Sequence, residues 1–334
     1  MKTESVLLQN LCAPCACRCR YCLLCWDGKP VGVPWDRGAR FALRFRDWML
    51  ENRPELRFRY TFGYAMEPPE LREALRFLRR IGSPQAEYLQ CDGLRMRGET
   101  ECAALAALLA REGVRRVNFT FYGTEAYHDR FAAREGDFAL LLRLLRAADA
   151  EGLSLSAGIP LTAENAVQID ELLGVLRGAA DGVRPFLFIP HGEGRGAALQ
   201  SVRCSERDFE MLSPEARALL NRELFRPECE WVSGGAYREE RARMLLLSLR
   251  ADNVERYETM PPGELIAEAE ALDDAYYAAF PPFAALAARY GEAQGGLFYR
   301  QRDLFARYRR LYARETGAAP YDVTDERQTG SRRY

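Results

Sequence analysis

Short apolar stretches alternate with longer amphipathic ones along the first 190 residues. Residues 56–63 alternate apolar and polar side chains, which is typical of a half-buried strand. In the stretch that follows, Leu71, Ala74, Leu75 and Leu78 recur at helical spacing. The same contrast predicts strands at residues 5–11, 56–63, 86–91, 115–122, 153–159 and 184–189, and helices at residues 69–80, 99–112, 137–151 and 164–177.

Strands that alternate with helices of this length predict βαβ units and a parallel sheet. The six strands are too few for a closed eight-stranded barrel. The expected fold class is therefore α/β, with residues 1–200 forming the main domain.

Beyond residue 200 the pattern changes. Residues 241–249 can form one further strand, and helices are expected from residue 253 onward, separated by Pro-rich breaks. Tyr276, Tyr277, Phe280 and Phe283 are interpreted as one packing face, and Tyr299, Phe305, Tyr308 and Tyr312 as another. We expect residues 201–334 to be a mainly helical extension with a polar, partly disordered tail after Gly317.

Size and charge restrict the function. The 334 residues are 48% hydrophobic, which is enough for a large core, and no apolar run is long enough to span a membrane. With 47 basic and 48 acidic side chains, the net charge of -1 gives no electrostatic reason to expect a nucleic-acid or membrane partner. We expect an enzyme.

The cysteines carry the clearest chemical signal. Six of the ten lie between Cys12 and Cys25, and only Cys15, Cys19 and Cys22 satisfy a C-x-x-x-C-x-x-C frame. Cysteine thiolates hold iron–sulfur clusters, and a short loop with three of them can bind a cubane cluster and leave the fourth iron without a protein ligand. The remaining loop cysteines, Cys12, Cys17 and Cys25, are interpreted as bystanders.

Other readings of the same loop remain open. Cys12/Cys15 and Cys22/Cys25 are C-x-x-C pairs that would suit a zinc knuckle, and Cys25 could complete a ferredoxin-type cluster. A disulfide framework is disfavoured because the cysteines are clustered and the chain opens on Met1-Lys2-Thr3-Glu4 without a secretory leader. We therefore expect a reducing cytoplasm and, for an exposed cluster, an anaerobic niche.

The cysteine frame, with Tyr21 just before its last cysteine, resembles the signature of the radical S-adenosylmethionine (SAM) enzymes. The resemblance implies a partial (β/α)6 barrel with the cluster loop after the first strand. It implies a [4Fe–4S] cluster on Cys15, Cys19 and Cys22, whose open iron binds SAM. It also implies an electron donor of the flavodoxin or ferredoxin type.

The resemblance can be followed along the strands. Phe62-Gly63-Tyr64-Ala65-Met66-Glu67-Pro68 stands where family members carry Gly-Gly-Glu-Pro, and Pro190-His191-Gly192-Glu193-Gly194-Arg195-Gly196 resembles their Pro-x-Gly-Arg turn. Leu89-Gln90-Cys91-Asp92-Gly93 looks like their Thr-Asn-Gly element, with aspartate for asparagine. The implied cofactor-binding residues are Tyr21, Gly63, Tyr64, Glu67, Thr120, Asn165 and Ile189.

Tyr127-His128-Asp129 and Gly136-Asp137-Phe138 are similar to a run common in members that act on peptides. A ribosomal peptide is therefore the first substrate hypothesis, with a maturase or epimerase reaction. The auxiliary-cluster domain of such enzymes is not expected, because only Cys204 and Cys229 follow the barrel. The alternatives are a small-molecule mutase or dehydrogenase and a non-catalytic zinc or Fe–S sensor.

Several side chains have ordinary structural interpretations. Asp129 suits a helix cap, and His128 is interpreted as structural before catalytic. His191 fits a turn, although its place after a strand allows substrate contact. Cys204 or Cys229 could return a hydrogen atom to a substrate radical, but an inert thiol is the more common role. No catalytic residue is assigned.

Overall fold

The computed structural model describes residues 1–25, 31–63, 67–68, 70–233 and 236–334. All six strands expected in the first 190 residues are present, with shifted ends. The strands are β1 Lys2–Gln9, β2 Arg57–Thr61, β3 Tyr88–Gln90, β4 Arg116–Thr120, β5 Ser154–Pro160, β6 Arg184–Phe188, β7 Phe225–Pro227, β8 Ala242–Ser248, β9 Phe298–Arg300 and β10 Gly330–Arg333.

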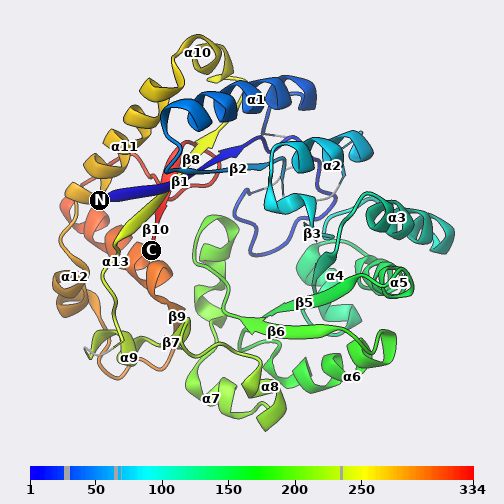
Figure 1. The fold of residues 1–334 in the computed structure, drawn as a ribbon. Helices are drawn as coiled ribbons and strands as arrows, with labels where there is room; N and C mark the ends of the chain where they lie inside the picture. The colour runs from blue at the N-terminus through cyan, green and yellow to red at the C-terminus, as the bar shows by residue number, and fades with distance from the viewer. Residues whose placement is uncertain (26–30, 64–66, 69, 234–235) are drawn as a thin grey trace.

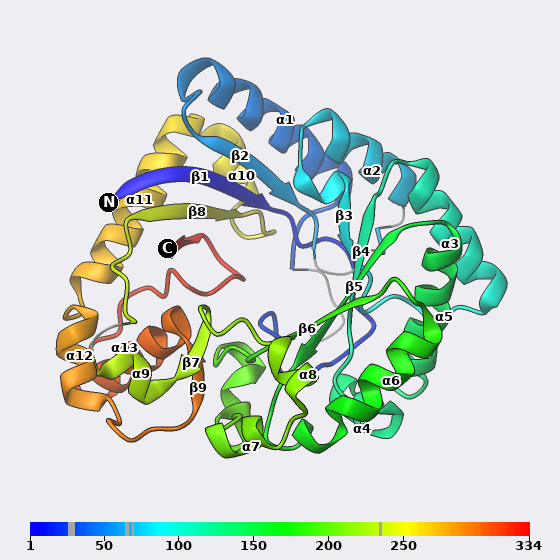
Figure 2. The same ribbon diagram turned by 60° about the horizontal axis from the view of Figure 1, so that its bottom comes forward.

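The strands form an incomplete parallel barrel. β3, β4, β5 and β6 pair in that order, and β2 pairs with β1 in a second sheet; every one of these pairings is parallel. Figures 1 and 2 show the two sheets curving around one centre, with helices on the outside. The predicted α/β class and partial barrel are confirmed by this topology.

The strand expected at residues 241–249 exists as β8, and it joins the barrel. β8 pairs in parallel with β1 on the side opposite β2, so that Val6 lies opposite Leu245 as well as Phe58. The segment predicted as an extension therefore contributes a strand to the barrel sheet. A domain boundary at residue 200 stays a prediction.

The two faces of the strands differ sharply. On β4, Val117 and Phe119 are completely buried against the helices, as alternation in a strand requires. Their neighbours Arg116, Asn118 and Thr120 point the other way, toward the barrel interior, which we call the lumen. A closed barrel fills its interior with branched apolar side chains. This lumen is lined instead by polar and aromatic ones.

Helices cover the outside of the barrel. Within the first 190 residues, two helices were not expected: α1, where Phe41, Phe45 and Met49 face the core, and the short α4 before Gly136. The helices are α1 Trp35–Asn52, α2 Leu71–Arg80, α3 Glu99–Arg111, α4 Glu125–Ala132, α5 Asp137–Ala150, α6 Ile169–Ala179, α7 Glu206–Glu210, α8 Pro214–Ala218, α9 Glu228–Val232, α10 Val254–Thr259, α11 Pro262–Ala278, α12 Phe283–Tyr290 and α13 Gln301–Thr316.

The C-terminal region has a small core of its own. Trp231, Phe283, Tyr299 and Tyr308 pack together, and β7 pairs with β9 beside them. This confirms that the aromatic residues of α11 to α13 are packing faces. Among the described residues, no helix combines the length and apolar character needed to cross a membrane.

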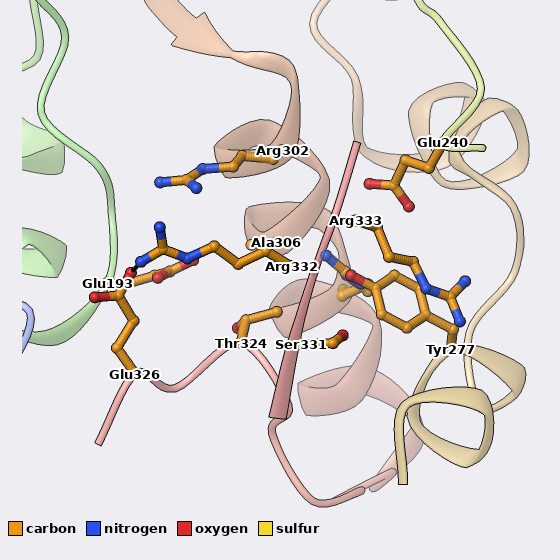
Figure 3. A pocket seen from close by; sticks show the side chains of 11 residues that line it. Glu193, Glu240, Tyr277, Arg302, Ala306, Thr324, Glu326, Ser331, Arg332 and Arg333 are labelled. Carbon is orange, nitrogen blue, oxygen red and sulfur yellow. Dashed lines mark ion pairs between the residues drawn. The ribbon is translucent and has the colours of Figure 1, made fainter. Parts of the chain in front are cut away.

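The end of the tail forms a strand, and partial disorder elsewhere in the tail stays a prediction. β10 pairs antiparallel with β8, and Ser331 is completely buried. Figure 3 shows the alternation along β10: Arg332 reaches toward Glu326 and Arg333 lies beside Tyr277 on the other side. The hollow between them has a volume of about 30 Å³, which suits one water molecule and no larger ligand.

Candidate functional site

The cysteine loop lies across the carboxyl ends of the barrel strands. Backbone hydrogen bonds hold it there: Ala13 N donates to Phe62 O at 3.1 Å, Ala16 N to Gly93 O at 2.8 Å, and Arg18 N to Ala132 O at 2.8 Å. The acceptors follow β2, β3 and α4 respectively. In parallel α/β folds this end of the strands is where ligands gather.

Gly63 permits the close contact between this loop and β2. Its φ is +139°, a region that side chains rarely adopt, and an added Cβ would lie 3.3 Å from Ala13 Cβ. Gly63 thus packs directly under the cysteine loop. The neighbouring predicted residue, Tyr64, lies outside the described residues.

The three thiols of the frame are half-buried on one side of the loop. The Tyr122 hydroxyl donates to Cys19 Sγ at 3.0 Å, and Cys22 N donates to Cys19 O at 3.1 Å. The carbonyl of Cys22 accepts from Arg195 N at 3.1 Å, so the loop after β6 holds the far end of the frame. The loop is therefore clamped at β2, β3, α4 and the β6 end.

Cys17 differs from the three cysteines of the frame because its side chain is buried. Its Sγ lies 3.6 Å from Asp137 Oδ2 and 3.8 Å from Arg134 Nη1. Hydrogen bonds from the thiols of Cys15 and Cys19, and then the Arg134 guanidinium, lower the pKa of Cys17. The same hydrogen bonds to Cys17 raise the pKa of Cys15 and of Cys19, so in the metal-free loop the negative charge of this group of thiols lies on Cys17.

The zinc-knuckle reading is not favoured by the position of Cys12. Its thiol points back at Phe62 O, 3.9 Å away, and burial raises the pKa of Cys12 to about 11. Structural zinc requires four thiolates or imidazoles converging on one point. Within the part of the chain that the structure describes, no three Cys, His, Asp or Glu side chains are already arranged as a closed metal site.

The donor set nevertheless fits an iron–sulfur cluster. Cys15, Cys19 and Cys22 are thiols outside any disulfide, partly exposed on one loop that lies over the ends of the strands. The assignment of these three as cluster ligands stays a prediction.

Tyr21 closes the mouth of the lumen beside the thiols. Its ring lies 5.7 Å from Tyr122, 6.3 Å from Phe188 and 5.7 Å from His191, measured between ring centroids. It thus bridges the ends of β4 and β6. Burial raises the pKa of Tyr21, so the phenol stays protonated and can donate a hydrogen bond.

A carboxyl group lies at the end of β3 within this mouth. Asp92 accepts from Thr120 N at 2.8 Å and from the Thr120 hydroxyl at 2.6 Å, and Gln90 also bonds to it. Burial raises the pKa of Asp92 to about 6. The sequence places Asp92 in a motif, but Asp92 was not predicted to belong to the site. Its position just after a parallel strand could have indicated that it does, because ligands bind at that end of the strands.

Comparison with known proteins gives a partial likeness to solved structures. No protein-family model and no curated protein matches the chain. Streptococcus suis SuiB bound to precursor peptide SuiA is 12% identical, with a TM-score of 0.43 over 57% of this chain and 40% of SuiB. anSMEcpe with bound AdoMet is 15% identical, with a TM-score of 0.42 over 62% of this chain and 57% of that one.

Escherichia coli HemN, a coproporphyrinogen III oxidase described as a radical SAM enzyme, is 16% identical. Its TM-score is 0.36 over 65% of this chain and 50% of HemN. The likenesses thus span only about half of each solved chain, and all three TM-scores lie below 0.5. The account of the fold therefore rests on the strand pairing described above, and that of the site on its own geometry.

Two other predicted cofactor residues, Asn165 and Ile189, are buried near the ends of β5 and β6. Asn165 is buried, and its amide bonds to Tyr122 O and Pro160 O, both at 2.7 Å, and to Thr162 N at 2.8 Å. It ties the ends of β4 and β5 together. Ile189 is buried directly after β6. For these residues a cofactor contact stays a prediction.

Glu67 lies at the entrance to α2 and is engaged by arginines. It pairs with Arg97 at 2.6 Å and accepts from Arg95 N at 3.0 Å. These bonds link the β2 and β3 ends on the outside of the mouth. The contacts of Glu67 are those of a loop anchor, and its predicted cofactor role stays untested.

The His-Asp run has a structural role. His128 Nδ1 accepts from Tyr122 N at 3.1 Å, which leaves Nε2 to donate to Asp137 at 3.0 Å. Asp129 accepts from Gly136 N at 2.6 Å and Phe138 N at 2.9 Å. Asp129 therefore caps α5, as the interpretation of it as a capping residue anticipated.

Replacing Asp129 by alanine is expected to lower the free energy of unfolding by about 1–2 kcal/mol, because two backbone donors at the start of α5 lose their acceptor. Urea denaturation followed by circular dichroism measures the change. The exposed neighbour Glu135→Ala is the control and should change it by less than about 0.5 kcal/mol. An unchanged midpoint for Asp129→Ala would show that the cap contributes nothing.

His191 faces the mouth from the β6 end. Its Nδ1 accepts from Glu193 N at 3.2 Å, and burial lowers the pKa of His191 to about 4. The imidazole is therefore neutral near pH 7. Because the unfolded chain binds the proton more tightly, the stability due to His191 is complete above about pH 6.5 and decreases as the pH falls toward 4.

An NMR titration of the metal-free protein tests whether the pKa of His191 is lowered. The chain has two histidines, and His191→Gln identifies the signals of His191 by their loss. We expect these signals to keep their neutral-form shifts from pH 8 down to pH 5. A midpoint near 6.5 would mean that the ring is solvated and does not lie in the packed mouth.

Proposed function

We propose that this chain is a radical SAM enzyme. The observation that carries the proposal is the position of the Cys15–Cys22 loop: three half-buried thiols are clamped over the carboxyl ends of parallel strands, at the mouth of a polar lumen. A cubane cluster needs thiolates at this spacing, and radical chemistry needs a shielded chamber beside it.

Cys15, Cys19 and Cys22 would hold the [4Fe–4S] cluster. Bound there and reduced, the cluster would supply the single electron for reductive cleavage of SAM to methionine and 5′-deoxyadenosine, with the hydrogen atom of the 5′-deoxyadenosine coming from the substrate. A flavodoxin or ferredoxin type of protein is the proposed electron donor, in an anaerobic cytoplasm.

The chain's own residues position and shield this chemistry. The Tyr122 hydroxyl bonds to Cys19 Sγ, and hydrogen bonds to cluster sulfur tune reduction potential. Tyr21, Phe131 and Phe188 form an apolar wall that excludes water from the mouth. Asp92 and Thr120 present oxygen atoms to the same space and suit the hydroxyl groups of a ribose.

The substrate is proposed to be a peptide, and a small molecule is the second candidate. The similarity of the Tyr127-to-Phe138 run to peptide-modifying enzymes supports a peptide, as does the polar lumen. Cys204 is not a favoured hydrogen-atom donor, because it is completely buried.

Anaerobic reconstitution with iron and sulfide, followed by SAM and dithionite, tests the proposal. We expect 5′-deoxyadenosine to appear in liquid chromatography, with methionine in equal amount. Stoichiometric zinc after purification, with no cluster and no 5′-deoxyadenosine, would contradict it and favour a metal-sensing protein.

A further inference from the structure

Two adjoining cavities open at the end of the barrel opposite the cysteine loop. They have volumes of about 720 and 360 Å³ and share Tyr88, Arg116 and Ser154 as lining residues. They lie at the amino-terminal ends of β3 to β6 and on their lumen faces. Both are large enough for several side chains of a ligand.

The cavities are strongly basic for so neutral a protein. Arg115, Arg116 and Arg184 line them, and none of the three forms an ion pair within the described part of the chain. Arg79, also in the lining, is neutralised by Glu112 at 3.4 Å. Glu87 is the acidic lining residue. Unpaired guanidinium groups at a concave surface attract carboxylates and bind them in bidentate geometry.

Aromatic rings flank these charges. Tyr88 is 41% exposed and Phe186 39% exposed, in contrast to the completely buried Phe119 and Phe121 of the same sheet. The Arg116 guanidinium lies 6.0 Å from the centre of the Tyr88 ring. Exposed rings beside arginines suit a flat or apolar side chain next to an acidic one.

The strand register sets the spacing of the charges. Arg116 on β4 lies opposite Ser154 on β5, and Ser156 lies opposite Arg184 on β6. The two arginines are thus two strand spacings apart across the sheet and two residues apart along it, about 12 Å in all. In an extended peptide, side chains four positions apart lie on the same face and are separated by about 13 Å.

A polar path leads from this end of the barrel toward the thiols. The Ser156 hydroxyl donates to Asn118 at 2.8 Å, Asn118 donates to Gln90 at 2.7 Å, and Gln90 bonds to Thr120 at 3.1 Å. Along β4, Arg116 and Thr120 are about 13 Å apart, a distance that four extended residues span.

We propose that the amino-terminal end of the lumen binds an acidic segment of a peptide, with two carboxylates four positions apart on Arg116 and Arg184 and an aromatic side chain between Tyr88 and Phe186. The inference rests on the proposed function in one respect: it takes this segment to belong to the substrate. The residue to be modified then lies about four positions from the acidic pair.

Fluorescence anisotropy with a fluorescein-labelled decapeptide tests the site without iron, SAM or reductant. The probe has two aspartates four positions apart, one phenylalanine midway between them, and glycine and serine elsewhere. We expect binding to weaken at least about tenfold when asparagines replace the aspartates, and to weaken with added salt. Equal binding of the asparagine peptide would overturn the proposal.

Protein variants locate the site. Arg116→Gln with Arg184→Gln should lower affinity at least about tenfold, whereas Arg207→Gln on α7, an exposed and unpaired arginine elsewhere, should stay within about twofold. An unchanged affinity of the double variant contradicts the proposal. Stronger competition by an RNA of equal charge would also overturn it, in favour of a nucleic-acid ligand.

The affinity of the parent protein for a series of peptides also tests the proposal, and this measurement does not depend on whether a protein variant folds. Aspartates four positions apart should bind more tightly than adjacent ones, and the reverse order would refute the proposed register. Because no turnover is involved, binding can succeed while 5′-deoxyadenosine formation fails, or the reverse. The inference and the proposed function are thus tested separately.

Discussion

Replacing Cys19 by alanine is expected to reduce 5′-deoxyadenosine formation at least about 100-fold, to the level of a blank without protein. Removing a group that only supports a metal ligand costs 10–100-fold in activity or metal affinity, so loss of a ligand should cost more. Cys19 also accepts the hydrogen bond from Tyr122 that joins the loop to the end of β4. Iron content and 5′-deoxyadenosine should fall together.

Two cysteine variants serve as matched controls for Cys19→Ala. Cys25→Ala changes a half-buried thiol of the same loop, and Cys229→Ala changes a half-buried thiol in the C-terminal region. Both should keep their iron and form 5′-deoxyadenosine within about twofold of the parent. If Cys25→Ala loses its iron as Cys19→Ala does, the cluster has four cysteine ligands and the open-iron chemistry is wrong.

Replacing Asp273 by alanine is expected to lower the free energy of unfolding by about 3–5 kcal/mol, since it removes the completely buried carboxylate that two guanidinium groups share and leaves them only more exposed carboxylates. Asp273 is completely buried on α11 and pairs with Arg243 of β8 and Arg333 of β10, each at 2.7 Å. It also bonds to Ser331. One carboxylate therefore fastens the tail to the barrel.

The loss of stability in Asp273→Ala should depend on pH in a defined direction. Burial by itself raises the pKa of Asp273, but the bonds from Arg333, Ser331 and Arg243 outweigh it and hold the pKa below its usual range. Asp273 therefore stabilises the fold fully above about pH 4, the pKa of an aspartate in the unfolded chain. This stabilisation is lost as the pH falls through the lower pKa that Asp273 has in the folded protein. The difference in free energy of unfolding between the parent protein and Asp273→Ala should therefore become smaller in acid.

Asp274 is the matched control for Asp273. It also pairs with Arg243, at 2.6 Å, but its side chain is 57% exposed. Asp274→Ala should therefore cost no more than about 1 kcal/mol. Urea denaturation at pH 7 and at pH 3.5 measures the free energy of unfolding of the parent protein, Asp273→Ala and Asp274→Ala. Equal losses for the two variants would mean that burial does not decide the effect.

The sequence was sufficient where structure is set by local pattern. The alternation in residues 56–63 and the helical repeat of Leu71, Ala74, Leu75 and Leu78 gave β2 and α2, because each buries one face. The position of the Cys15–Cys22 loop followed from its place after the first strand. No long-range contact had to be known for these predictions.

It was insufficient where partners lie far apart in the chain. The polar tail was expected to be partly disordered because Ser331 and Arg333 have no local reason to be buried. Their partner Asp273 lies about 60 residues earlier, and β8 meets β1 across about 240 residues. The lumen arginines were invisible for the same reason, since Arg116 and Arg184 come together only when β4, β5 and β6 pair.

The most direct test of the central claim is Mössbauer spectroscopy of the protein reconstituted with ⁵⁷Fe and sulfide, recorded before and after SAM is added. The account predicts one [4Fe–4S] cluster per chain, with one iron in four changing its isomer shift and quadrupole splitting when SAM binds, and no such cluster in Cys19→Ala. Four irons that are indifferent to SAM, or a protein that takes up zinc in place of iron, would contradict it.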